Sequence, residues 1–196
     1  MLKRSFDILF SISTIILLSP LFLAISISIL IDSRGGVFYK QIRIGKNGSD
    51  FFILKFRSMQ SGSDKKGLLT MSDRDNRITS VGHFIRKYKL DELPQLINVF
   101  IGTMSVVGPR PEVPEYVNLY TDEQRKVLTV KPGITDYASI EYRNENEILR
   151  KAENPEQLYI QEIMPAKLKL NLKYIEEQSI FTDAKIIVRT IFKIIC

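Results

Sequence analysis

The sequence predicts a helix-dominated α+β fold, in which an N-terminal membrane helix precedes one cytosolic domain. Three observations lead to this prediction. Residues 8–31 are uncharged and strongly apolar, Asn47-Gly48 lies between two β-rich runs, and apolar residues recur at intervals of three and four in much of the rest of the chain. We therefore expect a membrane helix-hairpin over residues 1–33, and a β-hairpin surrounded by helices over residues 34–196.

The composition limits the classes of partner. The chain has 196 residues, with 28 Lys and Arg against 22 Asp and Glu, which gives a net charge of +6. This balance favours anionic partners: phosphorylated substrates, an anionic membrane surface or nucleic acid. Nucleic acid is disfavoured, because the basic residues are not interleaved with aromatic ones and no nucleic-acid or zinc motif is present. The single cysteine, Cys196, cannot form an intramolecular disulfide, so nothing indicates an oxidising compartment.

Residues 8–31 are long enough to cross a bilayer core at about 1.5 Å per residue. Ser19-Pro20 lies in the middle, and because proline removes a backbone donor we expect the helix to break there. Both flanks are basic, which is typical of cytoplasmic segments: Lys3 and Arg4 before the run, and Arg34, Lys40, Arg43 and Lys46 after it. A re-entrant helix in one leaflet keeps both flanks on one side. The alternatives are a kinked transmembrane anchor and, less favoured, a cleaved signal peptide.

Serines recur along this run, and we expect their hydroxyls to bond backbone groups freed near the bend: Ser11, Ser13, Ser19, Ser26 and Ser28.

The hairpin is expected from residues 37–44 and 51–56, joined by a turn containing Asn47-Gly48. Lys55 and Arg57 are two residues apart at the end of the second run. Residues so spaced on a strand share a face, so this pair could bind one diphosphate. The structural alternative is a solvated pair of charges on an edge strand.

A polar, glycine-containing loop over residues 60–76 is expected next, followed by a helix that begins near Thr79 or Ser80. His83, the only histidine, is adjacent to apolar residues and is left out of the predicted site.

Residues 87–111 contain the candidate site. Asp91 and Glu92 follow a basic cluster that includes Arg86, and they precede Pro94, which is tolerated in the first turn of a helix. We expect both carboxylates at a helix N-terminus, where the dipole keeps them ionised to act as metal ligands or as a nucleophile. The alternative is that Asp91 caps the helix and Glu92 only decorates its first turn.

The helix after this dyad is predicted from an apolar face that is followed by Gly102: Leu93, Leu96, Ile97, Phe100 and Ile101. Beyond it lies Gly108-Pro109-Arg110-Pro111. The two prolines hold Arg110 rigidly, and a side chain fixed before binding loses less entropy when it contacts a phosphate. Alternatively, Arg110 is a turn residue paired with a surface carboxylate.

The C-terminal third is expected to be helical over residues 113–127, 166–175 and 180–195. In the last helix one face is apolar and the opposite face is charged: Ile180, Ala184, Ile187, Val188, Ile191 and Ile195 against Asp183, Lys185, Arg189 and Lys193. A basic amphipathic helix is typical of an interfacial membrane helix. Packing on the core of the domain itself is the alternative.

Four motifs occur in one order: KFRSM (55–59), residues 76–87, LDELPQLINV (90–99) and MSVVGPRP (104–111). Together they closely resemble the bacterial sugar transferase family, and the resemblance extends over nearly the whole chain from Lys3-Arg4-Ser5-Phe6-Asp7 onward. It implies a small monotopic phosphoglycosyl transferase of the bacterial inner membrane, whose catalytic domain faces the cytoplasm. Members carry a re-entrant helix broken at a Ser-Pro in this place.

The resemblance also implies the reaction. Such enzymes move a sugar 1-phosphate from a UDP-sugar to undecaprenyl phosphate, release UMP and require Mg²⁺. The lipid-linked product then passes to downstream glycosyltransferases. The implied roles are Asp91 as a nucleophile that forms a phosphosugar intermediate, Asp91 and Glu92 as metal ligands, and a set of phosphate-binding cations: Lys55, Arg57, Arg86, Arg110 and Arg143.

The sequence departs from the family at residues 136–143. Many members have Gly-Trp-Ala-Gln-Val-Asn-Gly-Arg where this chain has Asp-Tyr-Ala-Ser-Ile-Glu-Tyr-Arg, near the sugar or nucleotide site; Arg143 keeps the basic position. Asn171 stands where relatives often have Asp.

Two alternatives remain open: a membrane-anchored basic scaffold or lipid-binding protein without catalysis, and a single-displacement transferase in which Asp91 only binds metal. A glycosidase is disfavoured, because adjacent carboxylates do not supply its two separated groups.

Overall fold

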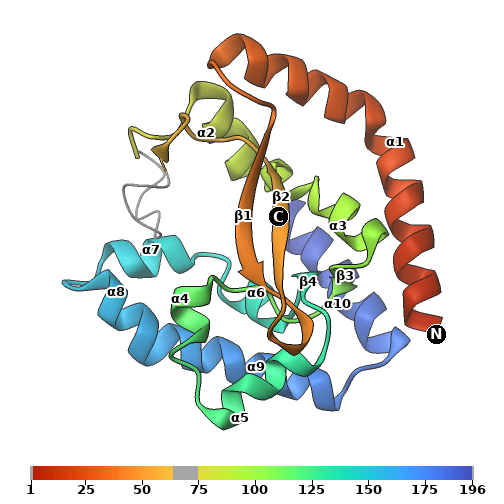
Figure 1. Ribbon diagram of the computed structural model, residues 1–196, viewed down its shortest axis with the longest axis vertical. Helices are drawn as coiled ribbons and strands as arrows, with labels where there is room; N and C mark the ends of the chain where they lie inside the picture. Colours follow the sequence, from red (N-terminus) through yellow and green to blue (C-terminus); the bar gives the residue numbers. More distant parts are fainter. Residues whose placement is uncertain (1, 64–74, 196) are drawn as a thin grey trace.

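The structure, a computed structural model, describes residues 2–63 and 75–195. Helices dominate it and the strands are few, which confirms the helix-dominated α+β prediction (Figure 1). The helices are α1 (Leu2–Asp32), α2 (Ser80–Lys87), α3 (Gln95–Ile101), α4 (Pro114–Val117), α5 (Asp122–Arg125), α6 (Tyr137–Glu141), α7 (Glu145–Arg150), α8 (Pro155–Leu158), α9 (Met164–Glu176) and α10 (Ile180–Ile195). The strands are β1 (Phe38–Ile44), β2 (Asp50–Phe56), β3 (Ser105–Val107) and β4 (Gly133–Thr135). Most of the predicted loop over residues 60–76 lies outside the described residues.

Strands β1 and β2 form the predicted antiparallel hairpin, with Phe38 opposite Phe56 and Tyr39 opposite Lys55. Asn47 and Gly48 in the turn have positive φ angles of 58° and 75°, the conformation that favours an Asn-Gly pair in a tight hairpin. A second sheet was not predicted. It is a parallel pair in which Ser105 of β3 lies opposite Gly133 of β4 and Val107 opposite Thr135.

Helix α1 changes direction near its middle, as the expected bend requires, but it is not interrupted at Ser19-Pro20 (Figure 1). Proline leaves the carbonyl four residues earlier, that of Ile16, without its usual donor. The Ser19 hydroxyl replaces that donor, with 2.8 Å between Ser19 Oγ and Ile16 O. The Ser26 hydroxyl likewise bonds the Phe22 carbonyl. The helix is long and apolar enough to cross a membrane.

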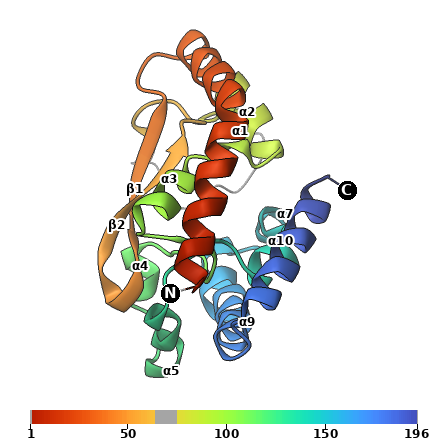
Figure 2. The same ribbon diagram turned by 90° about the vertical axis from the view of Figure 1, so that its right-hand side faces the viewer.

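Polar side chains at the start of α1 attach it to the rest of the molecule. The buried Asp7 accepts hydrogen bonds from Ser105 Oγ and from the Val106 N–H, the latter at 3.0 Å. Arg4 donates to the last carbonyls of α3, those of Val99 and Phe100. Figure 2 shows α1 lying along the outside of α3. The helix is therefore joined to the domain by specific hydrogen bonds as well as by apolar contact.

The end of α1 packs on the upper part of the hairpin. Ile25 and Ile29 form a buried cluster with Phe56 of β2 and Ile85 of α2. The expected start of α2 is confirmed, because Thr79 is its N-cap and accepts from the Gly82 N–H at 3.0 Å.

The predicted helix over residues 113–127 is instead two short helices, α4 and α5. The break follows from local chemistry. Thr121 and Gln124 form a capping box, and it starts a new helix at Asp122.

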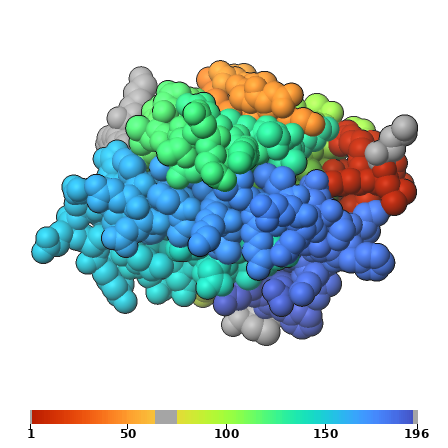
Figure 3. Space-filling model, turned by 90° about the horizontal axis from the view of Figure 1, so that it is seen from below, coloured from red at the N-terminus to blue at the C-terminus, as the bar shows by residue number. Residues whose placement is uncertain are grey.

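Helices α8 to α10 cover one face of the molecule, with the start of α1 at its edge (Figure 3). The predicted helix over residues 180–195 is confirmed as α10, but its buried face is not the predicted apolar one. Asp183, expected on the polar face, is buried and pairs with Lys3, while Ile186 fills the core. The apolar residues on the outside are exposed: Ile180, Phe181, Val188, Ile191 and Phe192.

Candidate active site

A cavity of about 1020 Å³ contains the Asp-Glu dyad. The first wall of the cavity is formed by β1, the end of β2 and residues 57–63, the second by α2 and residues 89–92, and the third by Arg110 and residues 143–147. Segments that are distant in the sequence thus meet around Asp91 and Glu92. All seven residues to which phosphate or catalytic roles were assigned line this cavity: Lys55, Arg57, Arg86, Asp91, Glu92, Arg110 and Arg143.

The dyad lies in a single 3₁₀ turn, Leu90–Glu92, just before Pro94 and the first residue of α3. This is the expected position before a helix N-terminus. Lys89 precedes the turn with a φ angle of 56°, a left-handed conformation that non-glycine residues seldom adopt. The sharp change of chain direction at Lys89 brings the two carboxylates into the cavity.

Glu92 is held by two cations. Its Oε1 lies 3.0 Å from Lys55 Nζ, and its Oε2 lies 3.0 Å from Arg110 Nη1; Arg110 Nη2 also donates to Oε1. Burial alone would raise the pKa of Glu92, but the attraction of Arg110 and Lys55 outweighs it and holds that pKa well below its usual value. Glu92 is therefore a firmly ionised, structurally engaged carboxylate.

Asp91 differs from its neighbour. It is only 7 % exposed, and within the described residues its carboxylate has no hydrogen-bond or ion-pair partner. Burial and, second, repulsion by Glu92 raise the pKa of Asp91, against the attraction of Lys55, Arg86 and Lys89. Burial therefore has the largest effect on the pKa of Asp91, whereas two cations hold the pKa of Glu92 down. Environments that shift neighbouring acids in opposite directions are typical of catalytic pairs.

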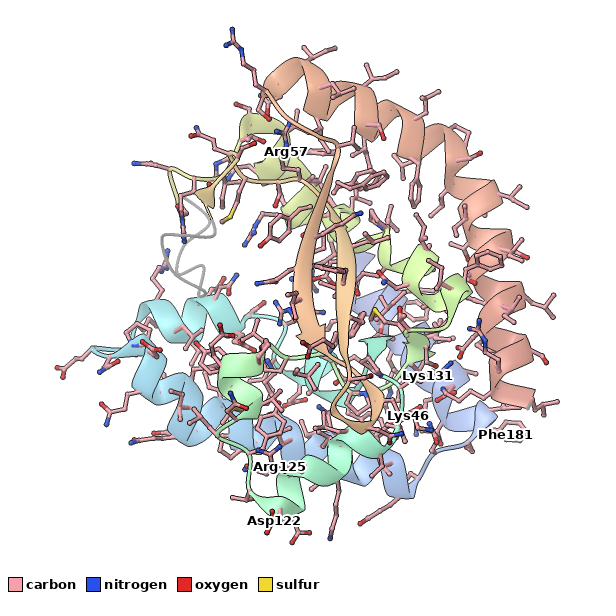
Figure 4. All side chains as sticks on the ribbon, viewed as in Figure 1. Lys46, Arg57, Asp122, Arg125, Lys131 and Phe181 are labelled. Atoms are coloured by element: carbon pink, nitrogen blue, oxygen red, sulfur yellow. The ribbon has the colours of Figure 1, made fainter. Side chains whose placement is uncertain are left out.

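Arg57 is placed differently from Lys55, although both were expected on one face. Strand β2 ends at Phe56, so the alternation of side chains stops before Arg57. The buried Arg57 guanidinium donates to the Ser33 carbonyl at 2.8 Å and to the Arg34 carbonyl, where the chain leaves α1 (Figure 4). Its edge faces the cavity, but most of its donors are already engaged.

Arg86 and Arg143 also line the cavity, and within the described residues neither side chain makes an ion pair or a hydrogen bond. Both guanidinium groups are therefore available to an anion in the cavity.

Sequence analysis missed the contribution of β1. Tyr39, Gln41 and Arg43 line the cavity together with His83, which was left out of the site. Arg43 Nη1 donates to the Pro111 carbonyl and to Glu112, each at 3.1 Å. The available signal was that these three polar residues alternate along β1 and so lie on one face of the strand. Lys55, which is opposite Tyr39 in β2, lies on the same face.

The turn that carries Arg110 extends the β3–β4 pair. The Gly108 N–H donates to the Thr135 carbonyl at 3.0 Å, and the Gly133 N–H to the Pro109 carbonyl at 2.9 Å. A Cβ on Gly108 would lie 2.5 Å from the Lys131 carbonyl oxygen, so this approach requires glycine. The short sheet thus delivers Arg110 to Glu92.

No cluster of three or more His, Cys, Asp or Glu side chains is placed to hold a metal ion in the part of the chain that the structure describes. Mg²⁺ does not need one, because it commonly binds one or two carboxylates together with substrate phosphates and water. Asp91 and Glu92, in a cavity with cations for a diphosphate, fit that donor set.

Comparisons with known proteins place the chain in a family. The family described as bacterial sugar transferase matches residues 1–196. A UDP-glucose:undecaprenyl-phosphate glucose-1-phosphate transferase of Escherichia coli K12 is 36% identical over 201 residues, which cover 98% of this chain and 40% of that protein. An uncharacterized sugar transferase, EpsL of Bacillus subtilis, is 37% identical over 194 residues, covering 99% and 87%.

A third relative, a UDP-N-acetylgalactosamine-undecaprenyl-phosphate N-acetylgalactosaminephosphotransferase of Aeromonas hydrophila, is 43% identical over 142 residues, 71% of this chain and 34% of its own length. The chain therefore spans about two fifths of the Escherichia coli relative and nearly nine tenths of EpsL.

Proposed function

Because the chain belongs to the bacterial sugar transferase family, we propose that it transfers a sugar 1-phosphate from a UDP-sugar to undecaprenyl phosphate and releases UMP. The names of the Escherichia coli and Aeromonas hydrophila relatives support this reaction. In this chain the observation that carries the proposal is the Asp91 carboxylate, which is unpaired within the described residues and lies in a cavity lined by cations.

We propose a double displacement. An Asp91 carboxylate oxygen attacks the phosphorus that bears the sugar, the bond from that phosphorus to the UMP oxygen breaks, and an aspartyl-phosphosugar forms. A phosphate oxygen of undecaprenyl phosphate then attacks the same phosphorus and expels the Asp91 carboxylate. Asp91 suits this role, because its carboxylate needs no protein partner to be removed before it can attack.

Lys55 and Arg110 have a second role in this proposal. Both pair with Glu92 in the structure, with 3.0 Å between Lys55 Nζ and Glu92 Oε1 and 3.0 Å between Arg110 Nη1 and Glu92 Oε2. A diphosphate carries more charge than one carboxylate and would draw both cations toward its oxygens. Glu92 would then be free, together with Asp91, to hold Mg²⁺, which supplies charge neutralisation on the diphosphate.

Arg86 and Arg143 complete the set of cations. Neither has to leave a protein partner among the described residues, so both can contact the phosphates of the nucleotide directly. Charge neutralisation and positioning dominate phosphoryl transfer, which is consistent with a cavity that has more cations than acids.

Membrane attachment is proposed through α1, which exposes most of its apolar side chains, and through the exposed outer residues of α10. Phe84 of α2 and Phe100 and Ile101 of α3 are also exposed. We propose that α1 re-enters one leaflet of the inner membrane and that the domain lies on the cytoplasmic side. The undecaprenyl chain would then stay in lipid while its phosphate reaches the cavity.

The test is Asp91→Asn with radiolabelled UDP-sugars. We expect the unaltered protein to release UMP and to form a labelled protein adduct without acceptor, whereas the variant does neither. The matched control is Asp122→Asn, the same change at an exposed acid of α5 (Figure 4), which is expected to leave both signals unchanged. Transfer without an adduct would favour single displacement, and absence of UMP release with a panel of UDP-sugars would favour a non-catalytic scaffold.

A further inference from the structure

Pro109-Arg110-Pro111 has a single backbone N–H group, that of Arg110, because proline nitrogen carries no hydrogen. This N–H donates to Asp136 Oδ2, with 3.1 Å between nitrogen and oxygen. The carbonyls on either side have partners as well, since Pro109 O accepts from Gly133 and Pro111 O from Arg43. The backbone around Arg110 is thus held on three sides, and Asp136 supplies the one acceptor that comes from a side chain.

Asp136 is fully buried, with 0 % of its surface exposed. Its other oxygen, Oδ1, accepts from the Ser139 N–H at 2.6 Å and caps the N-terminus of α6. It has no ion-pair partner among the described residues. Burying a carboxylate is costly unless it is hydrogen-bonded, and here each oxygen is bonded to a backbone N–H from a different segment.

These two bonds connect the two segments that form the third wall of the cavity. One oxygen holds the turn that presents Arg110 to Glu92, and the other holds the start of α6, the helix that leads to Arg143. We propose, on the basis of the function proposed above, that Asp136 is a positioning residue that fixes the Arg110 backbone so that its guanidinium reaches the substrate diphosphate.

Charge and position predict opposite effects at this residue. Asp136 is an anion near a site for anions, so if its charge were its main effect, neutralising it would strengthen the binding of a diphosphate. If its hydrogen bond to Arg110 is its main effect, the same change lets the turn shift and weakens binding and transfer, because displacements of about 1 Å in positioning groups cost up to about 100-fold in rate. The sign of the effect therefore separates the two roles.

Asp136→Asn is the first variant. The asparagine side chain has one acceptor oxygen and one NH₂ group, so it can accept from only one of the two N–H donors. Its NH₂ group would face the second donor. We expect kcat/KM for the UDP-sugar to fall by about tenfold or more, and the increase in melting temperature caused by UDP to become smaller.

A double-mutant cycle with Arg110→Ala distinguishes positioning from general destabilisation. If Asp136 acts through the Arg110 side chain, Asp136→Asn has little further effect once that side chain is absent. An equal loss of kcat/KM in both backgrounds would overturn the proposal, and so would tighter UDP binding by Asp136→Asn.

Two further variants control for stability. Asp136→Ser keeps one oxygen that can cap α6 but has none for Arg110, so we expect it to lower kcat/KM while it loses less thermal stability than Asp136→Asn. Thr121→Ala removes the N-cap of α5, outside the cavity, and should lower the melting temperature without changing kcat/KM.

The proposed function and this inference fail separately. If the unaltered protein releases no UMP from UDP-sugars, the proposed function is wrong. If the unaltered protein is active and Asp136→Asn has the same kcat/KM, only the positioning role of Asp136 is wrong.

Discussion

Replacing Glu92 by its amide is expected to lower stability, whereas replacing the adjacent Asp91 by its amide is not. Glu92 compensates two cations, Lys55 and Arg110, and its side chain is 13 % exposed. Asp91 is buried with no partner among the described residues, and its pKa is raised first by burial and then by Glu92. Glu92→Gln therefore leaves two cations uncompensated, whereas Asp91→Asn removes an anion that the fold does not stabilise.

The magnitude follows from the geometry. Removing one partner of a fully buried ion pair costs about 3–5 kcal/mol. Because the Arg110 side chain is 34 % exposed and partly screened by water, we expect about 2–3 kcal/mol for Glu92→Gln. In a chain of this length that corresponds to a fall in melting temperature of roughly 5–10 °C. Asp91→Asn should melt at the same temperature as the unaltered protein or above it.

The pH dependence gives an internal check. The pKa of Glu92 is lower in the folded state than in the unfolded chain, so its contribution is fully present above the unfolded value, about 4.3, and is lost as the pH falls through the lower folded value. The difference in melting temperature between the unaltered protein and Glu92→Gln should thus be constant near pH 7 and close only in acid.

Scanning calorimetry or intrinsic fluorescence in detergent micelles measures these temperatures. An equal fall for Asp91→Asn and Glu92→Gln would refute the reasoning, because it would mean that Asp91 is as well compensated as Glu92.

Three further predictions concern Asp91, the middle of α1 and Arg57. Because burial and Glu92 raise the pKa of Asp91, formation of the labelled adduct should decline with acidification at a higher pH than for an ordinary aspartate, about 3.9; a constant yield down to about pH 4 would contradict this. Ser19→Ala leaves the Ile16 carbonyl without the hydroxyl that replaces the missing N–H of Pro20, and should lower stability in lipid vesicles by about 1 kcal/mol, an effect that vanishes in a Pro20→Ala background. Arg57→Ala should lower the melting temperature and leave KM for the UDP-sugar nearly unchanged, since Arg57 is bonded to backbone carbonyls at the end of α1. A raised KM with an unchanged melting temperature would instead assign Arg57 to the phosphates.

Parts of the fold that depend on local chemistry could be predicted from the sequence. Asn47-Gly48 specified the hairpin turn, Thr79 the start of α2 and Gly102 the end of α3, where its φ angle is 103°. Each of these signals acts within one or two turns of backbone, so no knowledge of distant contacts was needed. The position of Asp91 and Glu92 before α3 was predictable for the same reason.

The parallel pair of β3 and β4 could not be predicted in this way. Each strand has only three residues, and the pairing depends on Gly108 and Gly133 approaching closely although they are distant in the sequence. Asp136 was noticed only as a departure from the family pattern, because its contact with Arg110 exists only after this pairing.

Periodicity also left the orientation of α10 undecided. It identified the helix, but most of the large apolar residues are exposed on the outer surface of the molecule. Asp183 is instead buried, beside Lys3 and Tyr174. An apolar stripe shows that a helix has two faces, and it does not show whether lipid or the core covers the apolar one.

The start of α1 is bonded to the strand that leads to the candidate site. Lys3 and Asp7 were considered only as part of a flank and a motif, yet Asp7 bonds Ser105 and Val106, and Lys3 donates to the Val107 carbonyl at 3.1 Å. Ser105, Val106 and Val107 form β3, and β3 leads directly into the turn that carries Arg110. Helix α1 therefore holds β3 from one side, while β4 pairs with it from the other and Asp136 holds the turn that follows it. Because unpaired buried donors cost about 1–3 kcal/mol each, a movement of α1 relative to β3 would also shift the Arg110 turn, which links the proposed membrane attachment to the proposed site.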